Sequence, residues 1–264
     1  MAEFTSYAHG TPCWVDVTSP DLDGSIAFYK GLFGWEAHVA PQPEAGGYTM
    51  FTLKDKYVAA GSPPQQDGKA SYWTTYLASD DADDTAAKIR EAGGTVKMDP
   101  FDVFDSGRMT IAQDSTGATF GIWQANQHIG AQLANEPGTL QWNQCHTSDP
   151  AGATEFYVAA FGYEVDEVDL GLEHPFRVLK VRGRGIAGVR DLSSPEEPPH
   201  WSVTFSVADT DESVARAKEL GGTALMKPFD LPDIGRLAVL MDPAGAVFQV
   251  MKSAGPPAEP PEPA

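Results

Sequence analysis

A repeat at a spacing of 128 residues is the feature that most restricts what this chain can fold into. The segment PFDVFDSGRM begins at Pro100, and PFDLPDIGRL begins at Pro228. The same shift aligns further pairs along the chain: Trp14 with Trp142, Phe28 with Phe156, Tyr29 with Tyr157, Phe33 with Phe161, Trp73 with Trp201, Asp114 with Asp242 and Phe120 with Phe248. A register kept over such a distance indicates two copies of one domain.

The repeat also sets the expected domain boundaries. A chain of 264 residues is long enough for two domains that each bury a core of their own. We expect the first domain at residues 1–126, a linker at 127–137 and the second domain at 138–253. Residues 254–264 are rich in proline and lack large apolar side chains, which predicts a disordered tail.

Each copy divides once more into two similar halves. The first half begins with the alternating strand CWVDVTS, and a helix follows in which Leu22, Ile26, Tyr29 and Phe33 recur at helical spacing before Gly34 ends it. The second half repeats this order, with the strand YWTTYLAS, a helix near residues 83–92 and a closing hairpin. The pattern predicts an α+β fold of four βαβββ modules.

Three motifs carry a resemblance to a known family. FYKGLFGW, the turn EAGGTV and the hairpin sequence DSTGATF resemble the vicinal-oxygen-chelate (VOC) superfamily of glyoxalase, bleomycin-resistance and extradiol-dioxygenase proteins. The chain is most similar to fused two-domain, glyoxalase-like bacterial proteins. The resemblance implies that each pair of modules forms an eight-stranded, cupped mixed sheet with its helices outside, so the chain should contain two clefts.

Composition limits the partners and the cellular compartment. The formal net charge of −19 disfavours nucleic acid and anionic membranes. No apolar run is long enough to span a bilayer, and the N-terminus does not resemble a secretory signal, so we expect a cytoplasmic protein. Cys13 and Cys145 have no metal-binding spacing and are expected to be buried. The sequence leaves monomer and homodimer open.

Strand alternation identifies candidate ligand-binding residues in the first cleft. In the first strand, Val15 and Val17 suit the face against the helix, so Trp14 and Asp16 should point into the cleft. The other candidates in this cleft are Tyr48, Met50, Thr74, Tyr76 and Trp123. We expect Gly121 and Thr74 to leave space beside the aromatic rings.

The repeated phrase itself should lie on a loop along the cleft rim. There Arg108 is expected to pair with Asp105, and a direct role in ligand binding is a further possibility for this arginine. Because the phrase occurs in both copies although the predicted clefts differ, we interpret it mainly as part of the architecture.

In the second cleft the same rule selects five candidates: Trp142, Gln144, His146, Ser202 and Gln249. The resemblance implies that enzymes of the family hold a divalent metal with His, Glu or Gln at such positions. In the first cleft only Asp16 could bind a metal well, so we expect none there. Gln144, His146 and Gln249 are a partial set without a carboxylate, and a divalent metal in the second cleft stays an alternative.

These observations favour a protein without a cofactor that binds a small aromatic organic compound in the first cleft, for sequestration, as in bleomycin resistance, or for secondary-metabolite processing. The alternative is an enzyme of the family, a lyase, isomerase, dioxygenase or hydroxylase, acting in the second cleft. In a third hypothesis the second domain is only a scaffold. The remaining histidines are expected to have surface roles: His9, His38, His128 and His174.

Overall fold

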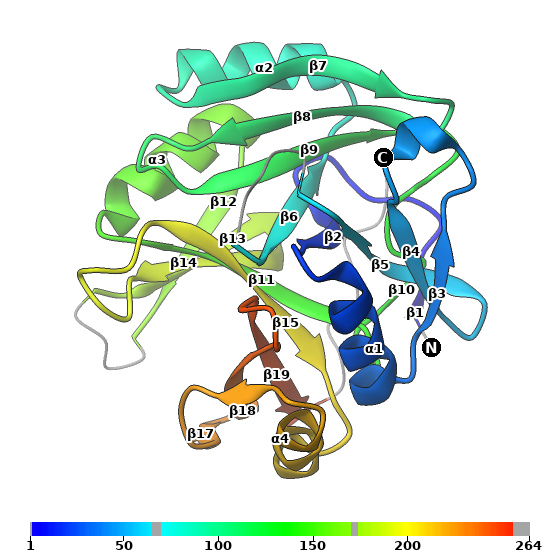
Figure 1. Ribbon diagram of the computed structural model, residues 1–264. Coiled ribbons are helices and arrows are strands. Elements are labelled where there is room, and N and C mark those ends of the chain that lie inside the picture. The colour runs from blue at the N-terminus through cyan, green and yellow to red at the C-terminus, as the bar shows by residue number, and fades with distance from the viewer. Residues whose placement is uncertain (1, 65–69, 170–173, 256–264) are drawn as a thin grey trace.

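The computed structural model describes residues 2–64, 70–169 and 174–255, and the first two modules form one eight-stranded sheet. Its strand order is β3-β4-β5-β2-β6-β9-β8-β7 (Figure 1). The strands are β2 (Pro12–Thr18), β3 (Glu36–Val39), β4 (Thr49–Leu53), β5 (Lys56–Ser62), β6 (Tyr72–Ala78), β7 (Thr95–Val103), β8 (Gly107–Gln113) and β9 (Thr119–Ala125). The two modules join where β2 pairs antiparallel with β6.

The third and fourth modules form a second sheet of the same design. The order of its main path is β12-β13-β14-β11-β15-β19-β18-β16. These strands are β11 (Leu140–Thr147), β12 (Glu164–Val168), β13 (Phe176–Val181), β14 (Arg184–Asp191), β15 (His200–Ser206), β16 (Thr223–Ala224), β18 (Gly235–Met241) and β19 (Val247–Ser253). Short strand β17 (Phe229–Leu231) pairs with β18. The predicted arrangement of four βαβββ modules in two sheets is confirmed.

Each module contributes one α-helix, and all four begin at an aspartate. The helices are α1 (Leu22–Phe33), α2 (Ala82–Glu91), α3 (Pro150–Phe161) and α4 (Thr210–Glu219). The capping side chains accept hydrogen bonds from backbone N–H groups of the first turn: Asp21, Asp81, Asp149 and Asp209. Helices α1 and α3 end at Gly34 and Gly162, which adopt the left-handed conformation that glycine tolerates best.

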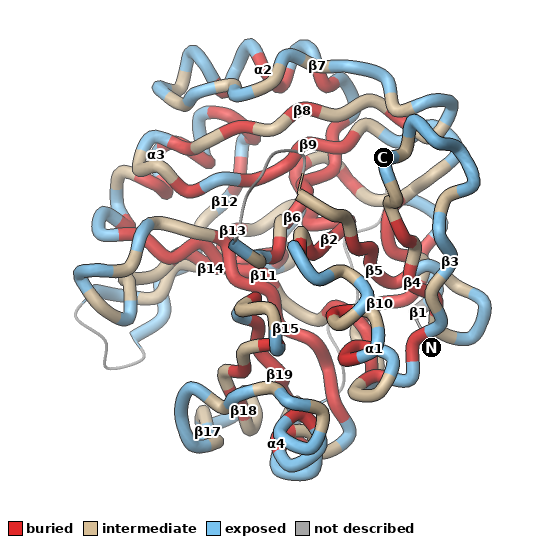
Figure 2. The backbone as a smooth tube through the Cα atoms, viewed as in Figure 1, coloured by how far each residue is buried: buried red, intermediate tan, exposed pale blue. Residues whose placement is uncertain are grey.

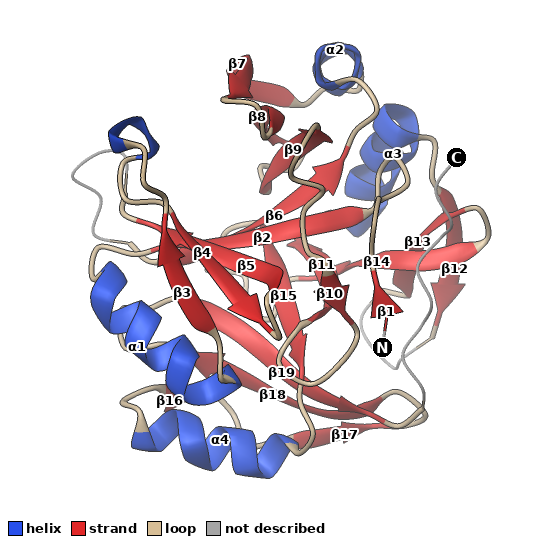
Figure 3. Ribbon diagram, turned by 90° about the vertical axis from the view of Figure 1, so that its right-hand side faces the viewer, coloured by secondary structure: helices blue, strands red, loops and turns tan. Residues whose placement is uncertain are grey.

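The helices pack between the two domains, which the sequence did not predict. Figure 3 shows α1 beside α4 and α2 beside α3, so each helix pair joins modules from different domains. One core cluster contains Phe28 and Phe33 of α1 together with Phe205 and Phe248 of the second domain. The cores are thus not confined to single domains as expected: of the three core clusters among the described residues, those around Phe28 and Phe156 draw side chains from both domains, whereas the third, around Trp14 and Trp123, lies within the first domain and the segment that follows it. Figure 2 shows the buried chain concentrated where the domains meet.

Two buried hydrogen-bonded pairs cross this domain interface. The Tyr29 hydroxyl donates to Asp242 Oδ2 (3.1 Å), and the Tyr157 hydroxyl donates to Asp114 Oδ2 (2.9 Å). A repeated tryptophan completes each pair through its indole N–H: Trp73 donates to the Tyr29 oxygen (3.0 Å) and Trp201 to the Tyr157 oxygen (2.7 Å). Since all these residues belong to the 128-residue repeat, their recurrence reflects an interface built twice from the same parts.

The segment between the domains is tied to both of them. Strand β10 (Leu133–Ala134) pairs antiparallel with β1 (Ala2–Glu3) and parallel with β11. Of the predicted disordered tail, residues 256–264 lie outside the described residues. Among the helices described, none has the length and apolar character needed to cross a membrane.

Candidate functional site

The concave face of the first sheet surrounds a cavity of about 1690 Å³, which we call the first cup. Its walls include all seven residues that alternation assigned to the first cleft: Trp14, Asp16, Tyr48, Met50, Thr74, Tyr76 and Trp123. On β2 the neighbouring Val15 and Val17 face the opposite way, into the core shared with the second domain. A period of two along the strand thus separates the cavity wall from the core.

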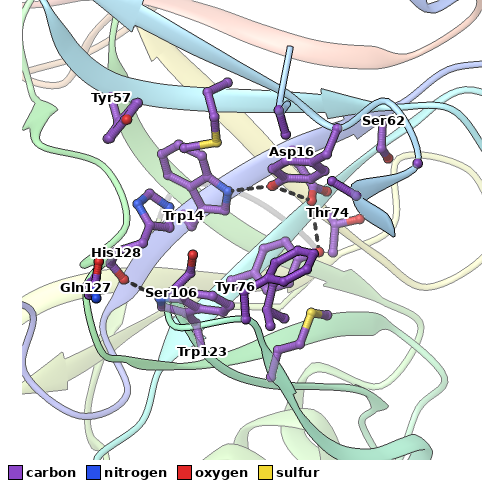
Figure 4. A pocket seen from close by; sticks show the side chains of 18 of the residues that line it. Trp14, Asp16, Tyr57, Ser62, Thr74, Tyr76, Ser106, Trp123, Gln127 and His128 are labelled. Carbon is purple, nitrogen blue, oxygen red and sulfur yellow. Dashed lines mark hydrogen bonds between the residues drawn. The ribbon is translucent and has the colours of Figure 1, made fainter. Parts of the chain in front are cut away.

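A buried carboxylate with two phenols forms the polar centre of the first cup. Asp16 Oδ2 accepts hydrogen bonds from the hydroxyls of Tyr76 (2.9 Å) and Tyr48 (3.2 Å). The indole N–H of Trp14 donates to the Tyr48 oxygen at 3.0 Å. Figure 4 shows Trp14, Asp16 and Tyr76 of this cluster close together on the cavity wall. Trp14 and Asp16 lie on β2, Tyr76 lies on β6, and Tyr48 immediately precedes β4.

Burial changes the acidity of this cluster. Asp16 is only 5% exposed, and loss of solvation raises the pKa of its carboxyl group to about 6, although the hydrogen bonds from Tyr76 and Tyr48 oppose the rise. Burial raises the pKa values of the Tyr48 and Tyr76 hydroxyls well above that of a solvated tyrosine, and the nearby Asp16 carboxylate adds to this rise. The phenols therefore stay protonated donors at neutral pH, whereas Asp16 can exchange a proton.

The wall next to the Asp16 cluster is aromatic and includes a histidine from the segment after β9. The His128 ring meets Trp14 edge-on at a centroid distance of 4.6 Å and lies 5.7 Å from the Trp123 ring and 5.6 Å from Tyr57. The Trp123 indole N–H donates to the His128 carbonyl at 2.7 Å. The predicted surface role of His128 is thus wrong: its backbone carbonyl, held by Trp123, fixes its ring against the wall (Figure 4).

The imidazole of His128 also contains a buried nitrogen, Nε2, without a hydrogen-bond partner among the described residues. Burial lowers the pKa of the imidazole to about 4, so the ring is neutral at physiological pH. Sequence reasoning missed this residue because it lies in a segment without periodicity, although its position five residues after Trp123 was an available signal.

Gly121 of β9 is needed for the position of Tyr76. A Cβ atom at residue 121 would lie 2.1 Å from Tyr76 Cδ1, so only glycine allows the ring to cross this strand. The expectation that Gly121 leaves open space is therefore wrong, because the Tyr76 ring occupies it. The glycine instead lets the phenol reach Asp16.

Arg108 has a structural position outside the cavity walls. Its guanidinium binds Asp83 at the start of α2 through two hydrogen bonds (2.7 and 3.1 Å) and Asp102 of β7 through a third (3.0 Å). Arg236 makes the equivalent contacts with Asp211 and Asp230. The predicted pairing of Arg108 with Asp105 is wrong: the arginine ties a helix to the β7–β8 hairpin, and its duplicate does the same.

On the equivalent face of the second sheet, which we call the second cup, the predicted residues bond mainly to one another. His146 Nε2 lies 3.0 Å from both Gln144 Nε2 and Ser202 Oγ, and Thr204 Oγ1 donates to Gln249 Oε1 at 3.1 Å. All of these side chains are buried, and burial lowers the pKa of His146 well below its usual value. Trp142, the fifth candidate, is half-buried on the same strand.

The two cups have the same strand register but different side chains on their concave faces. Strand register places Asp16 beside Ala60 in the first cup and Gln144 beside Gly188 in the second, as the repeat requires. Four cavity residues of the first cup are replaced at the equivalent positions, Asp16 by Gln144, Tyr48 by Phe176, Tyr76 by Thr204 and Trp123 by Met251, whereas Trp14 recurs as Trp142. Gly121, which makes room for the Tyr76 ring, is replaced by Gln249. The fold is formed in both copies, so it does not require the Asp16 cluster. This comparison makes the cluster a candidate site.

Comparison with known proteins identifies the family. Residues 12–122 match the model of the Glyoxalase/Bleomycin resistance protein/Dioxygenase superfamily, and residues 143–251 match a glyoxalase-like domain. This chain belongs to that superfamily. The proposed glyoxylase CFP32 of Mycobacterium tuberculosis is 42% identical over 96% of this chain and 99% of its own length. The anthracycline biosynthesis protein DnrV of Streptomyces peucetius is 39% identical over 94% and 95%, respectively.

Solved structures of the superfamily share the fold at low identity. A Mn(II)-bound glyoxalase from Novosphingobium aromaticivorans superimposes with a TM-score of 0.68 at 16% identity, over 96% of this chain and 85% of that one. The 2,3-dioxygenase LapB from Pseudomonas sp. KL28 gives 0.67 at 14% identity and covers 98% of both chains. At such identities the likeness concerns the fold alone.

The donors in the two cups do not fit the divalent metal that some superfamily members hold. In the first cup Asp16 Oδ2 already accepts two phenol hydrogen bonds, and Gly121 has no donor atom. In the second cup His146 Nε2 is held by two neighbours, Gln144 and Ser202. Among the residues that the structure describes, no three His, Cys, Asp or Glu side chains converge. Divalent ions usually need several such ligands.

Replacement of Asp16 should stabilise the protein in a pH-dependent way. A folded-state pKa of about 6, against 3.8 for a solvated aspartate side chain, favours folding while the carboxyl is protonated, and this contribution is lost as the pH rises from about 4 through 6. Asp16→Asn should therefore gain stability over wild type by up to about 3 kcal/mol between pH 4 and pH 8. Urea unfolding of both proteins at the two pH values measures the change, and a constant or declining difference would contradict it.

Proposed function

We propose that this chain binds a planar, hydroxylated aromatic compound in the first cup without a metal ion. The supporting observation is that the Asp16 cluster, which includes Trp14, and the rings of Trp123 and His128 line one large cavity. Flat rings can stack on the indoles, while a hydroxyl or carbonyl group at the ligand's edge meets the carboxylate and phenols.

Two further observations favour this assignment. The rings of Trp123 and His128 extend the aromatic wall beside Trp14, so a flat ligand could lie along several rings at once. A relative at 39% identity is named an anthracycline biosynthesis protein, which is consistent with a fused-ring aromatic ligand and with a role in secondary-metabolite processing. The expected enzyme site in the second cup has less support, because Gln144, His146 and Ser202 form a mutually bonded set there.

The proposal is tested with 1,4-dihydroxyanthraquinone as a probe. Equilibrium dialysis should show saturable binding to the wild type, and Trp14→Ala/Trp123→Ala should weaken it by at least about 10-fold because two stacking surfaces are lost. Trp142→Ala is the matched control at the equivalent position of the second cup and should leave the affinity within about 2-fold. Equal affinity in the wild type and the double variant would reject the first cup as the binding site.

A further inference from the structure

The Asp16 cluster has the features of a proton-transfer site, and the proposed function does not use them. A carboxylate that only anchored a ligand hydroxyl would not need to be removed from water, since burial disfavours its charged form. Here Asp16 is buried at the floor of a cavity, with Thr74 of β6 and Ala60 of β5 beside it. It nevertheless lines the space that a ligand would occupy.

The groups around Asp16 leave it as the base. The ionisable side chains that face it are Tyr48 from the start of β4 and Tyr76 from β6, and both donate to the same oxygen, Oδ2. Both phenols stay protonated because burial and the carboxylate raise their pKa values. Lys97 and His128 line other parts of the cavity, and His128 is neutral. Of Asp16 and the two phenols bonded to it, only the carboxylate changes its protonation state near neutral pH.

We propose that Asp16 is the general base of a metal-free keto–enol isomerisation of a fused-ring aromatic ketone bound in the first cup. This inference rests on the proposed binding function and adds a reaction to it. Asp16 takes the proton from the carbon next to the carbonyl, and the C–H electron pair becomes a C=C bond. The same proton then passes to the carbonyl oxygen. One C–H and one C=O become one C=C and one O–H, so no electron is gained or lost and no co-reactant is needed.

The surrounding residues match this chemistry in three respects. The carboxylate pKa of about 6 lies close to physiological pH, where a base combines a large ionised fraction with useful basicity. The two phenols position the carboxylate, because both donate a hydrogen bond to the same oxygen, Oδ2. The sister cup has Gln144, Phe176 and Thr204 at the three positions, so the base and both phenols are absent together in the copy with the same fold.

Solvent exchange of 2-tetralone tests the inference without knowledge of the natural substrate. The full-length protein in D2O should accelerate deuterium incorporation at the C1 position of this bicyclic ketone, followed by proton NMR. Asp16→Asn should lower the protein-catalysed rate by at least about 100-fold, the lower limit for general-base catalysis. Its affinity for 2-tetralone, measured by calorimetry, should stay within about 3-fold. Asp23→Asn, which removes an exposed carboxylate of the same domain, should exchange like the wild type.

Two readouts separate a base from a residue that only supports the structure. The wild-type rate should rise with pH through about 6 and then level off, and the Asp16→Asn rate should lack this step. Tyr76→Phe keeps the ring above Gly121 but removes one hydrogen bond to the carboxylate, so it should retain binding and lower the rate about 3- to 30-fold.

Each alternative outcome has a defined meaning. Binding of 2-tetralone without accelerated exchange, full exchange in Asp16→Asn, or loss of exchange on adding EDTA would overturn the proposed base and leave the binding function intact. Absence of 2-tetralone binding to the wild type would count against the binding function and, with it, this inference.

Discussion

The first domain produced alone, as residues 1–137, is expected not to fold into a stable monomer. Its helix α1 would lose the rings that cover it, since Phe33 lies 5.0 Å from Phe205 and Tyr29 lies 5.6 Å from Phe248, measured between ring centroids. Exposure of each large buried side chain costs about 1.5–3 kcal/mol, and several such losses approach the whole stability of a domain. The Tyr29 hydroxyl would also lose its partner Asp242.

Circular dichroism and size-exclusion chromatography of the fragment measure this effect. We expect a weak or absent cooperative unfolding transition and self-association through the uncovered helices. The control is a mixture with residues 138–264, which should restore a folded one-to-one complex. A monomeric fragment that unfolds cooperatively within about 5 °C of the full chain would show that the shared cores are dispensable.

The second large effect is expected for Phe248→Ala, which should lower the free energy of unfolding by about 3–5 kcal/mol. Phe248 belongs to the second domain and is fully buried. Its ring centroid nevertheless lies 6.1 Å from that of Phe28, 5.6 Å from that of Tyr29 and 6.2 Å from that of Phe33, all in the first domain. Truncation leaves a cavity between two domains that cannot easily collapse, because both sides are held by sheets.

Urea unfolding followed by fluorescence and circular dichroism tests this value. The matched control is Val247→Ala, one residue earlier on β19, whose side chain is exposed and should change stability by no more than about 0.5 kcal/mol. Both probes should report one transition, because a shared core couples the domains. A loss below about 1 kcal/mol, or two separate transitions, would contradict the coupling.

These two predictions bear on the role of the second domain. The core cluster that contains Phe248 also contains Val15 and Val17 of β2, which alternate along that strand with Trp14 and Asp16. The second domain therefore supports the strand that carries the centre of the first cup. This packing is what the hypothesis of the second domain as a scaffold requires, and it needs no ligand in the second cup.

Much of the first cup could be predicted because alternation along a strand is a local property. Once Val15 and Val17 are assigned to the core, Trp14 and Asp16 must face the other side, and pairing in the sheet then aligns them with Thr74 and Tyr76. His128 and the partners of Arg108 could not be predicted in this way. His128 lies in a segment without regular structure. Arg108 pairs with Asp83, which is 25 residues away in the chain and lies on a neighbouring helix.

The sequence by itself determined the duplication, the four modules and the inward row of each strand, because these follow from repeated spacing and from periods of two and 3.6 residues. Only the tertiary structure decided that α1 packs on α4, that Tyr29 binds Asp242 and that Tyr76 crosses Gly121 to reach Asp16. These contacts join residues far apart in the chain, and their partners are selected by packing and hydrogen bonding in three dimensions, which no local pattern encodes.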